Sequence, residues 1–139
     1  MSGSFRKRRV LIVDDEHVIS DTLAIIFKNA GYDAKPSYSA EQALELLSQS
    51  GWVPDLAFID VRLPNMNGVD LAIHLKAEHA ACKLSLFSGQ PSAAEILEMA
   101  NAAGHSFEIL AKPIPPAELL HLASTMLAPS DPDDLHLPA

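Results

Sequence analysis

The chain has 139 residues and a formal net charge of −8. Its length fits one domain that can bury a real core, and its 48% apolar and 20% charged content is typical of a globular protein rather than a disordered one. The negative charge disfavours nucleic acid as a partner, and no apolar run approaches the roughly 20 residues that a membrane-spanning helix needs. We therefore expect neither nucleic acid nor a membrane among its partners.

The two ends of the chain differ in composition from the rest. Residues 1–8 form a basic N-terminal flank, residues 9–128 are predicted to fold as one domain, and residues 129–139 form a polar tail with three prolines and three aspartates. The apolar stretch after the basic residues is too short for a signal peptide. Cys82 is the only cysteine, so no internal disulfide can form, and we expect a cytoplasmic protein in which Cys82 is a small buried side chain.

Short apolar strands alternate with helical patterns along the chain. The predicted strands are residues 10–13, 32–37, 55–59, 83–87 and 107–111. The predicted helices are residues 17–30, 39–47, 69–79 and 92–104, followed by a last helix that Pro115 and Pro116 open. This alternation predicts an α/β fold, a doubly wound, flavodoxin-like parallel sheet of five strands with the order 2-1-3-4-5. Pro36 in the second strand favours an edge position for it.

Polar side chains follow four of these strands. Asp14 and Asp15 follow the first strand, Asp60 the third, Ser88 the fourth and Lys112 the fifth. The carboxyl ends of parallel strands meet at the edge where open α/β sheets bind ligands. Lys112 lies two strands from Asp60, roughly 10 Å at the backbone, and only a long side chain closes that gap.

Three carboxylates at one edge favour a bound divalent cation. Two like charges about 4 Å apart repel by about 4 kcal/mol at an effective dielectric constant near 20, and a cation removes this cost. An all-oxygen ligand set favours Mg²⁺, or Mn²⁺, over zinc. The constellation predicts a metal-dependent phosphoryl-transfer site.

The motifs, taken in order from about residue 9 to residue 127, resemble the signature of response-regulator receiver domains. The matching segments are Val13-Asp14-Asp15-Glu16, Ile59-Asp60 with Pro64 and Gly68 downstream, Ser88-Gly89, and Lys112-Pro113.

The resemblance implies a role for each of these residues. Asp60 would accept a phosphoryl group from a sensor histidine kinase, a histidine phosphotransfer protein or a small phosphodonor. Asp14, Asp15, the Asp60 carboxylate and the backbone carbonyl of Arg62 would hold Mg²⁺. Lys112 and Ser88 would contact the phosphoryl group as catalytic residues, Gly89 would leave it open to water, and the Lys112–Pro113 peptide bond would be cis.

The sequence departs from the family at the switch region. Receivers usually place an aromatic residue three positions before the lysine, and here that position is Ile109, with Phe107 on the same strand face. We expect switching to work through Ser88, Gly89 and a shift of the helix at residues 92–103.

The function expected from the resemblance is a stand-alone receiver of a two-component phosphorelay. It would signal through contacts with a downstream protein as a monomer or weak dimer, and would not be an enzyme beyond its own phosphorylation and dephosphorylation. The alternative is a receiver that binds its partner without phosphorylation. A haloacid-dehalogenase-type hydrolase would need an aspartate where Arg62 stands, and a flavin carrier would need a phosphate-binding loop where the acidic residues 14–16 stand.

Overall fold

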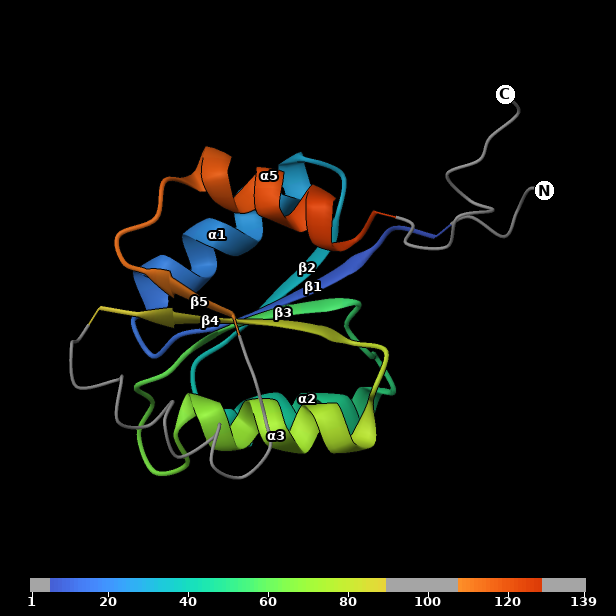
Figure 1. The fold of residues 1–139 in the computed structure, drawn as a ribbon. Coiled ribbons are helices and arrows are strands. Elements are labelled where there is room, and N and C mark those ends of the chain that lie inside the picture. Colours follow the sequence, from blue (N-terminus) through green and yellow to red (C-terminus); the bar gives the residue numbers. More distant parts are fainter. Residues whose placement is uncertain (1–5, 90–107, 129–139) are drawn as a thin grey trace.

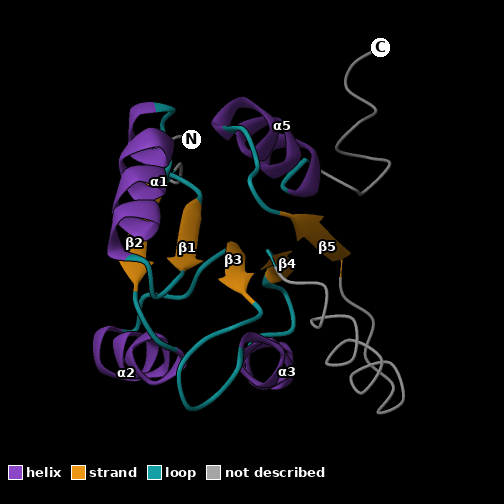
Figure 2. Ribbon diagram, turned by 90° about the vertical axis from the view of Figure 1, so that its left-hand side faces the viewer, coloured by secondary structure: helices purple, strands orange, loops and turns teal. Residues whose placement is uncertain are grey.

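The computed structural model describes residues 6–89 and 108–128, and its five strands form one parallel sheet with the order β2-β1-β3-β4-β5. The predicted fold class and strand order are thus confirmed. Figure 2, which looks along the strands, shows the five strands in this order. The strands are β1 (Arg9–Val13), β2 (Asp33–Ser37), β3 (Leu56–Asp60), β4 (Lys83–Ser88) and β5 (Glu108–Ala111).

The described helices cover both faces of the sheet. Helices α1 and α5 lie on one face, and α2 and α3 lie on the other (Figure 1). Their bounds are α1 (His17–Asn29), α2 (Ala40–Ser50), α3 (Gly68–Glu78) and α5 (Pro116–Met126). The helix predicted at residues 92–104, Phe107 and the tail at residues 129–139 lie outside the described residues. Within the described ranges, no helix combines the length and the apolar content that crossing a membrane requires.

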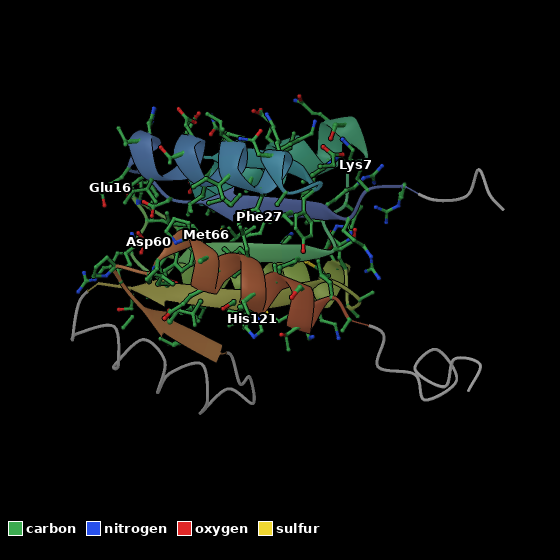
Figure 3. The ribbon with its side chains drawn as sticks, turned by 90° about the horizontal axis from the view of Figure 1, so that it is seen from above. Lys7, Glu16, Phe27, Asp60, Met66 and His121 are labelled. Atoms are coloured by element: carbon green, nitrogen blue, oxygen red, sulfur yellow. The ribbon has the colours of Figure 1, made fainter. Side chains whose placement is uncertain are left out.

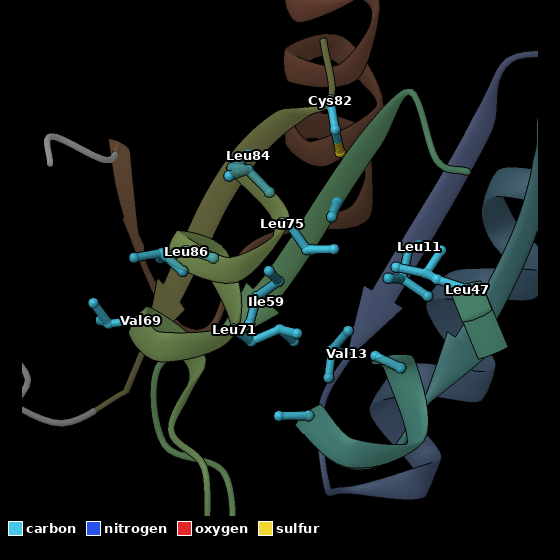
Figure 4. Packing of buried hydrophobic residues seen from close by; sticks show 14 of the residues in the cluster. Leu11, Val13, Leu47, Ile59, Val69, Leu71, Leu75, Cys82, Leu84 and Leu86 are labelled. Atoms are coloured by element: carbon cyan, nitrogen blue, oxygen red, sulfur yellow. The ribbon is translucent and has the colours of Figure 1, made fainter. Parts of the chain in front are cut away.

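Two apolar layers hold the helices on the sheet. One lies between the sheet and helices α2 and α3, where Leu11, Ile59, Leu71, Leu75 and Leu86 are fully buried (Figure 4). The other lies under α1 and α5 and is built around three stacked or tilted aromatic rings, whose neighbouring centroids are 5.6 Å apart; these are Phe27, Phe58 and Phe87. Because all of β3 is buried, Asp60 at its end is held by core on both sides.

Side chains and glycine fix the ends of α2 and α3. The Ser39 hydroxyl accepts a hydrogen bond from the backbone N–H of Gln42, as the capping pattern predicts, while the Gln42 side chain accepts from Tyr38. Helix α2 continues to Ser50, three residues beyond its predicted end, because Gly51 supplies the left-handed conformation (φ 70°) that ends it. The Asn67 side chain caps α3 in the same way as Ser39 caps α2.

The buried face of α1 includes a polar residue. Ser20 is fully buried beside Leu23 and Phe27, whereas Ile19 and Ile26 lie at the margin of the core. A serine therefore occupies the core side of α1 near the start of the helix, and its partners belong to the site described next.

Candidate functional site

The strand register brings the predicted site residues to one edge of the sheet. Val13 of β1 pairs with Ile59 of β3. The next residues along the two strands, Asp14 and Asp60, therefore lie side by side. Asp60 pairs with Phe87, and Ser88 pairs with Ala111, so Ser88 and Lys112 reach the same edge from β4 and β5.

The Lys112 side chain joins the first and third strands. Its Nζ lies 2.7 Å from Asp14 Oδ2 and 2.8 Å from Asp60 Oδ2, and 3.9 Å from Glu16 Oε1. The long side chain closes the gap of two strands that separates it from Asp60. Figure 3 shows Asp60 and Glu16 at the same end of the molecule.

Asp14 is fully buried and held on every side. Its Oδ1 accepts from the backbone N–H of Glu16 at 3.0 Å, and its own N–H donates to the carbonyl of Ser37 at 3.0 Å. The buried hydroxyl of Ser20 donates to the Asp14 carbonyl. The carboxylate is therefore fixed in position between β1 and α1.

Asp60 is held by the loop that follows β3. Its Oδ1 accepts from the backbone N–H of Arg62 at 3.0 Å, and only 6% of the residue is exposed. Gly68 packs against the backbone of Asp60 so closely that a Cβ on Gly68 would lie 2.0 Å from the Asp60 carbonyl oxygen. The loop therefore returns to β3 only with glycine at position 68.

Burial and charge oppose each other in this site. Burial is the main cause that raises the pKa of Asp60, and the hydrogen bonds from Lys112 and Arg62 reduce the rise without cancelling it. Burial alone would lower the pKa of Lys112, but its hydrogen bonds to Asp14 and Asp60 outweigh burial and raise it. Lys112 is therefore a fixed positive charge at neutral pH.

The carboxylates fit a divalent cation. Oxygen atoms of Asp14, Asp15 and Asp60 lie within 4.8 Å of one another, and Asp15 is exposed while the other two are buried. Three carboxylates against the one ammonium of Lys112 leave an excess of negative charge that a divalent cation would neutralise. Carboxylate oxygens are the ligands that Mg²⁺ prefers.

The predicted switch residues are placed only in part. Ser88 is half-buried, and its carbonyl accepts from the Lys112 N–H at 2.9 Å; a Cβ added to Gly89 would meet the Lys112 side chain at an ordinary 3.6 Å. Ile109 is half-buried and packs on the core layer under α2 and α3. Phe107 lies outside the described residues. The Lys112–Pro113 bond is cis, as the resemblance implied.

An apolar groove opens beside Lys112. It has a volume of about 500 Å³ and lies between the first half of α1, the end of β4 and the start of α5. Val18 on its rim is 78% exposed. The residues that line it are Val18, Ile19, Thr22, Leu23, Phe87, Gly89, Lys112, Pro113, Ile114 and Leu119.

Sequence reasoning missed three kinds of contributor. Ser20 and Ser37 both hydrogen-bond the backbone of Asp14. Ser20 could have been found from the sequence, because it lies three residues before Leu23 and seven before Phe27 and so on the same face of the helix as these buried residues. The contact of Gly68 with Asp60 has no local signal beyond the glycine itself. The groove joins segments some ninety residues apart in sequence, so no local pattern indicates it.

Known proteins resemble this chain over most of its length. The family model "Response regulator receiver domain" matches residues 10–124. "Regulatory protein VanR" of Enterococcus faecium is 30% identical over 112 residues, which cover 81% of this chain and 46% of VanR. "Response regulator protein PilR" of Pseudomonas aeruginosa is 28% identical over 127 residues, 91% of this chain and 28% of PilR. The chain thus spans less than half the length of both curated relatives.

A solved structure agrees with the sequence matches. The response regulator receiver protein from Pseudomonas putida superposes with a TM-score of 0.74 at 28% identity, covering 87% of this chain and 98% of that protein. A CheY-like receiver domain from Methanospirillum hungatei matches the fold with a TM-score of 0.73 at 24% identity, over 87% of this chain and 94% of that one. The chain belongs to the response regulator receiver domains of two-component systems, a family in which phosphorylation of an aspartate is general.

Proposed function

We propose that Asp60 accepts a phosphoryl group in a Mg²⁺-dependent reaction, with a phosphohistidine of a sensor kinase or phosphotransfer protein as donor. The observation that carries this proposal is the position of the Lys112 ammonium, 2.8 Å from Asp60 and 2.7 Å from Asp14 at an edge with three carboxylates. We regard residues 9–128 as the receiver and the protein as a switch rather than an enzyme.

The chain's own groups prepare Asp60 for attack on phosphorus. An Asp60 oxygen forms the new P–O bond while the P–N bond of the phosphohistidine breaks and the imidazole leaves with the electron pair. The Arg62 N–H orients the carboxylate, and Lys112 offers a positive charge to the oxygens of the transferred group. Ser88, at the same edge, is the hydroxyl that we assign to the phosphoryl group.

Asp14, Asp15, Asp60 and the Arg62 carbonyl are the groups that we assign to Mg²⁺. The bound ion supplies charge neutralisation for the phosphoryl oxygens. Both oxygens of Asp14 and both oxygens of Asp60 accept hydrogen bonds, but Asp14 is fully buried, which argues against it as the acceptor. Asp60 lies at the end of the central buried strand and is 6% exposed, which supports Asp60 as the acceptor of the buried pair.

The apolar groove supports a protein as the donor. A protein that brings a phosphohistidine to Asp60 must cover the edge of the sheet, and the groove beside Lys112 offers apolar surface for it. Val18 on the rim is largely exposed, so a partner would bury it. The output then passes to a downstream protein through contacts that differ between the two phosphorylation states.

Intact-mass spectrometry tests the acceptor chemistry. The protein is incubated with acetyl phosphate or phosphoramidate, with and without Mg²⁺, beside Asp60→Asn. As a matched control, Asp70→Asn changes an exposed aspartate in the first turn of α3. We expect one phosphoryl adduct that needs Mg²⁺, is retained in Asp70→Asn and is lost in Asp60→Asn. If the unaltered protein takes up no phosphoryl group from either donor, the binding-only receiver replaces this proposal.

A second pair of variants tests the groove. Val18→Asp places a charge on the rim of the groove, while Ile25→Asp places one at the other exposed apolar position of α1, outside the groove lining. We expect Val18→Asp alone to slow phosphotransfer from the cognate phosphohistidine protein, with acceptance from acetyl phosphate unchanged in both. Equal rates from the protein donor in the two variants would remove the groove from the docking surface.

A further inference from the structure

A basic hollow lies at the edge of the sheet opposite Asp60. It has a volume of about 470 Å³ and lies between the residues before β1, the end of α1 and the start of β2. Figure 3 shows Lys7 and Asp60 at opposite ends of the molecule. The residues that line it are Arg6, Lys7, Arg9, Lys28, Tyr32 and Asp33.

Two carboxylates near the hollow are already occupied. Asp55 accepts from both terminal nitrogens of Arg6, at 3.1 and 3.2 Å, and from the backbone N–H of Arg9 at 2.8 Å. Asp33 lies 3.9 Å from Nε of Arg9 and accepts from the indole N–H of Trp52 at 2.9 Å. Neither carboxylate is left over for the other cations of the hollow.

Among the residues that the structure describes, Lys7 and Lys28 are the cations of the hollow without a carboxylate partner. Both are exposed, and within residues 6–89 and 108–128 neither has a carboxylate partner. The hollow therefore carries an excess of positive charge on a chain whose formal net charge is −8. Such a surface attracts an acidic group.

The last helix ends beside this hollow. Nη2 of Arg8 donates to the carbonyl of Leu127 at 3.3 Å, and Leu127 packs on the same core layer as Tyr32. Figure 1 shows the end of α5 next to the start of β1. The chain beyond Ala128 thus begins next to the basic residues.

The segment that follows is acidic. Asp131, Asp133 and Asp134 occur within four residues. Asp131 is three residues beyond Ala128, and Asp134 is six, so their backbones reach at most roughly 10 and 20 Å from it. The opposite edge of the sheet, with Asp14, Asp15 and Asp60, would repel the same charges.

We propose that residues 131–134 bind the basic hollow of the same molecule, with their aspartates paired to Lys7 and Lys28. Tethering gives the segment an effective concentration on the order of millimolar, so weak exposed ion pairs suffice. The contact fastens the end of α5 to the start of β1 and holds three negative charges away from the acidic edge. It weakens with added salt.

A spin label beside the acidic segment tests this contact. Leu135→Cys keeps all three aspartates and places a thiol next to them in the sequence, whereas Cys82 is buried and is expected to stay unlabelled. With a nitroxide on Cys at position 135, the amide NMR signals of residues 28–33 should lose about half of their intensity or more at about 0.01 M salt and regain it at about 1 M, where the screening length falls from about 30 to about 3 Å.

Charge-reversal variants give the matched control. Lys7→Glu with Lys28→Glu should abolish the intensity loss, while Lys76→Glu with Lys83→Glu, two exposed lysines outside the hollow with the same change in charge, should retain it. Three results would overturn the proposal. These are no loss at low salt, a loss that survives both salt and reversal of Lys7 and Lys28, and a loss transferred to unlabelled ¹⁵N protein mixed with labelled ¹⁴N protein, which would place the contact between copies.

Discussion

Lys112 and Gly68 show how single residues determine the geometry around Asp60. Lys112 places one ammonium within 2.8 Å of two carboxylates from different strands, which otherwise repel each other. Gly68 acts through its lack of a side chain, because the backbone of α3 returns onto the carbonyl of Asp60. The first residue supplies charge to the site, and the second supplies space.

Gly68→Ala is predicted to be destabilising and to displace Asp60. The new Cβ would lie 2.0 Å from a backbone oxygen that cannot move aside alone, and such overpacking costs about 1–3 kcal/mol of unfolding free energy or more. The urea concentration at the midpoint of unfolding and the uptake of phosphoryl groups should both decrease. Gly89→Ala is the control, since its Cβ would make ordinary contact with Lys112 and should leave the unfolding free energy nearly unchanged. Equal stability of the two variants would contradict the prediction.

At the scale of the elements, Asp55 links the starts of β1 and β3 through hydrogen bonds, and Lys112 links their ends through ion pairs with Asp14 and Asp60. Asp55 precedes β3 and accepts hydrogen bonds from Arg6 and from the backbone of Arg9 at the start of β1. Burial acts to raise the pKa of Asp55, but the hydrogen bonds and charges of Arg6, Arg9 and Arg8 outweigh it, and its pKa lies below the ordinary value of 3.8.

The lowered pKa of Asp55 predicts a stability contribution that acid removes. A carboxyl with a depressed pKa in the folded state stabilises the fold above its unfolded pKa and loses that contribution as the pH falls through its folded pKa. Asp55→Asn should therefore cost about 1–2 kcal/mol at pH 7, and this difference from the unaltered protein should shrink below about pH 4. Urea unfolding at pH 7, 5 and 3 measures it. If the two proteins differ in unfolding free energy by the same amount at pH 7 and at pH 3, the prediction is contradicted.

Cys82, which directly precedes β4, reports on the integrity of the core layer under α2 and α3. The residue is 2% exposed, and burial raises the pKa of its thiol to about 12. Since the thiolate is the reactive form, we expect the folded protein to resist alkylation and to react fully once it is unfolded in urea. The rate of iodoacetamide labelling against urea concentration should follow the unfolding curve. Rapid labelling without urea would show that β4 is not packed as described.

The sequence predicted most of the fold and the location of the site, because both depend on patterns within single elements. The apolar strands, the cap at Ser39 and the polar residues after Val13, Ile59, Phe87 and Ala111 are all local signals. The end of α2 was missed because the polar residues 48–50 have no apolar period, although Gly51 marked the stop. The burial of Ser20 was missed because its partner is a backbone carbonyl after β1.

For the whole molecule, charge is divided between two opposite edges of the sheet. The acidic edge carries Asp14, Asp15 and Asp60, and the basic hollow carries Lys7 and Lys28. A divalent cation at the first edge is therefore expected to add to global stability, because it relieves repulsion that exists only in the folded chain.

Mg²⁺ is predicted to raise the unfolding free energy. At ten times its dissociation constant the gain should be about 1.4 kcal/mol, measured by urea unfolding at constant ionic strength. Asp15→Asn should abolish the gain, and without Mg²⁺ this variant should be at least as stable as the unaltered protein because one repelling charge is gone. A gain of equal size in Asp15→Asn would show that Mg²⁺ acts elsewhere.

The most direct test of the proposed function is to locate the phosphoryl group by peptide mass spectrometry after treatment with acetyl phosphate and Mg²⁺. An intact mass counts the phosphoryl groups but does not show which of Asp14, Asp15 and Asp60 carries one, and oxygens of all three lie within 4.8 Å of one another. We predict that the modification is on Asp60 and on neither Asp14 nor Asp15. A phosphoryl group on Asp15, the exposed member of the three, would contradict the assignment of Asp60 as the acceptor.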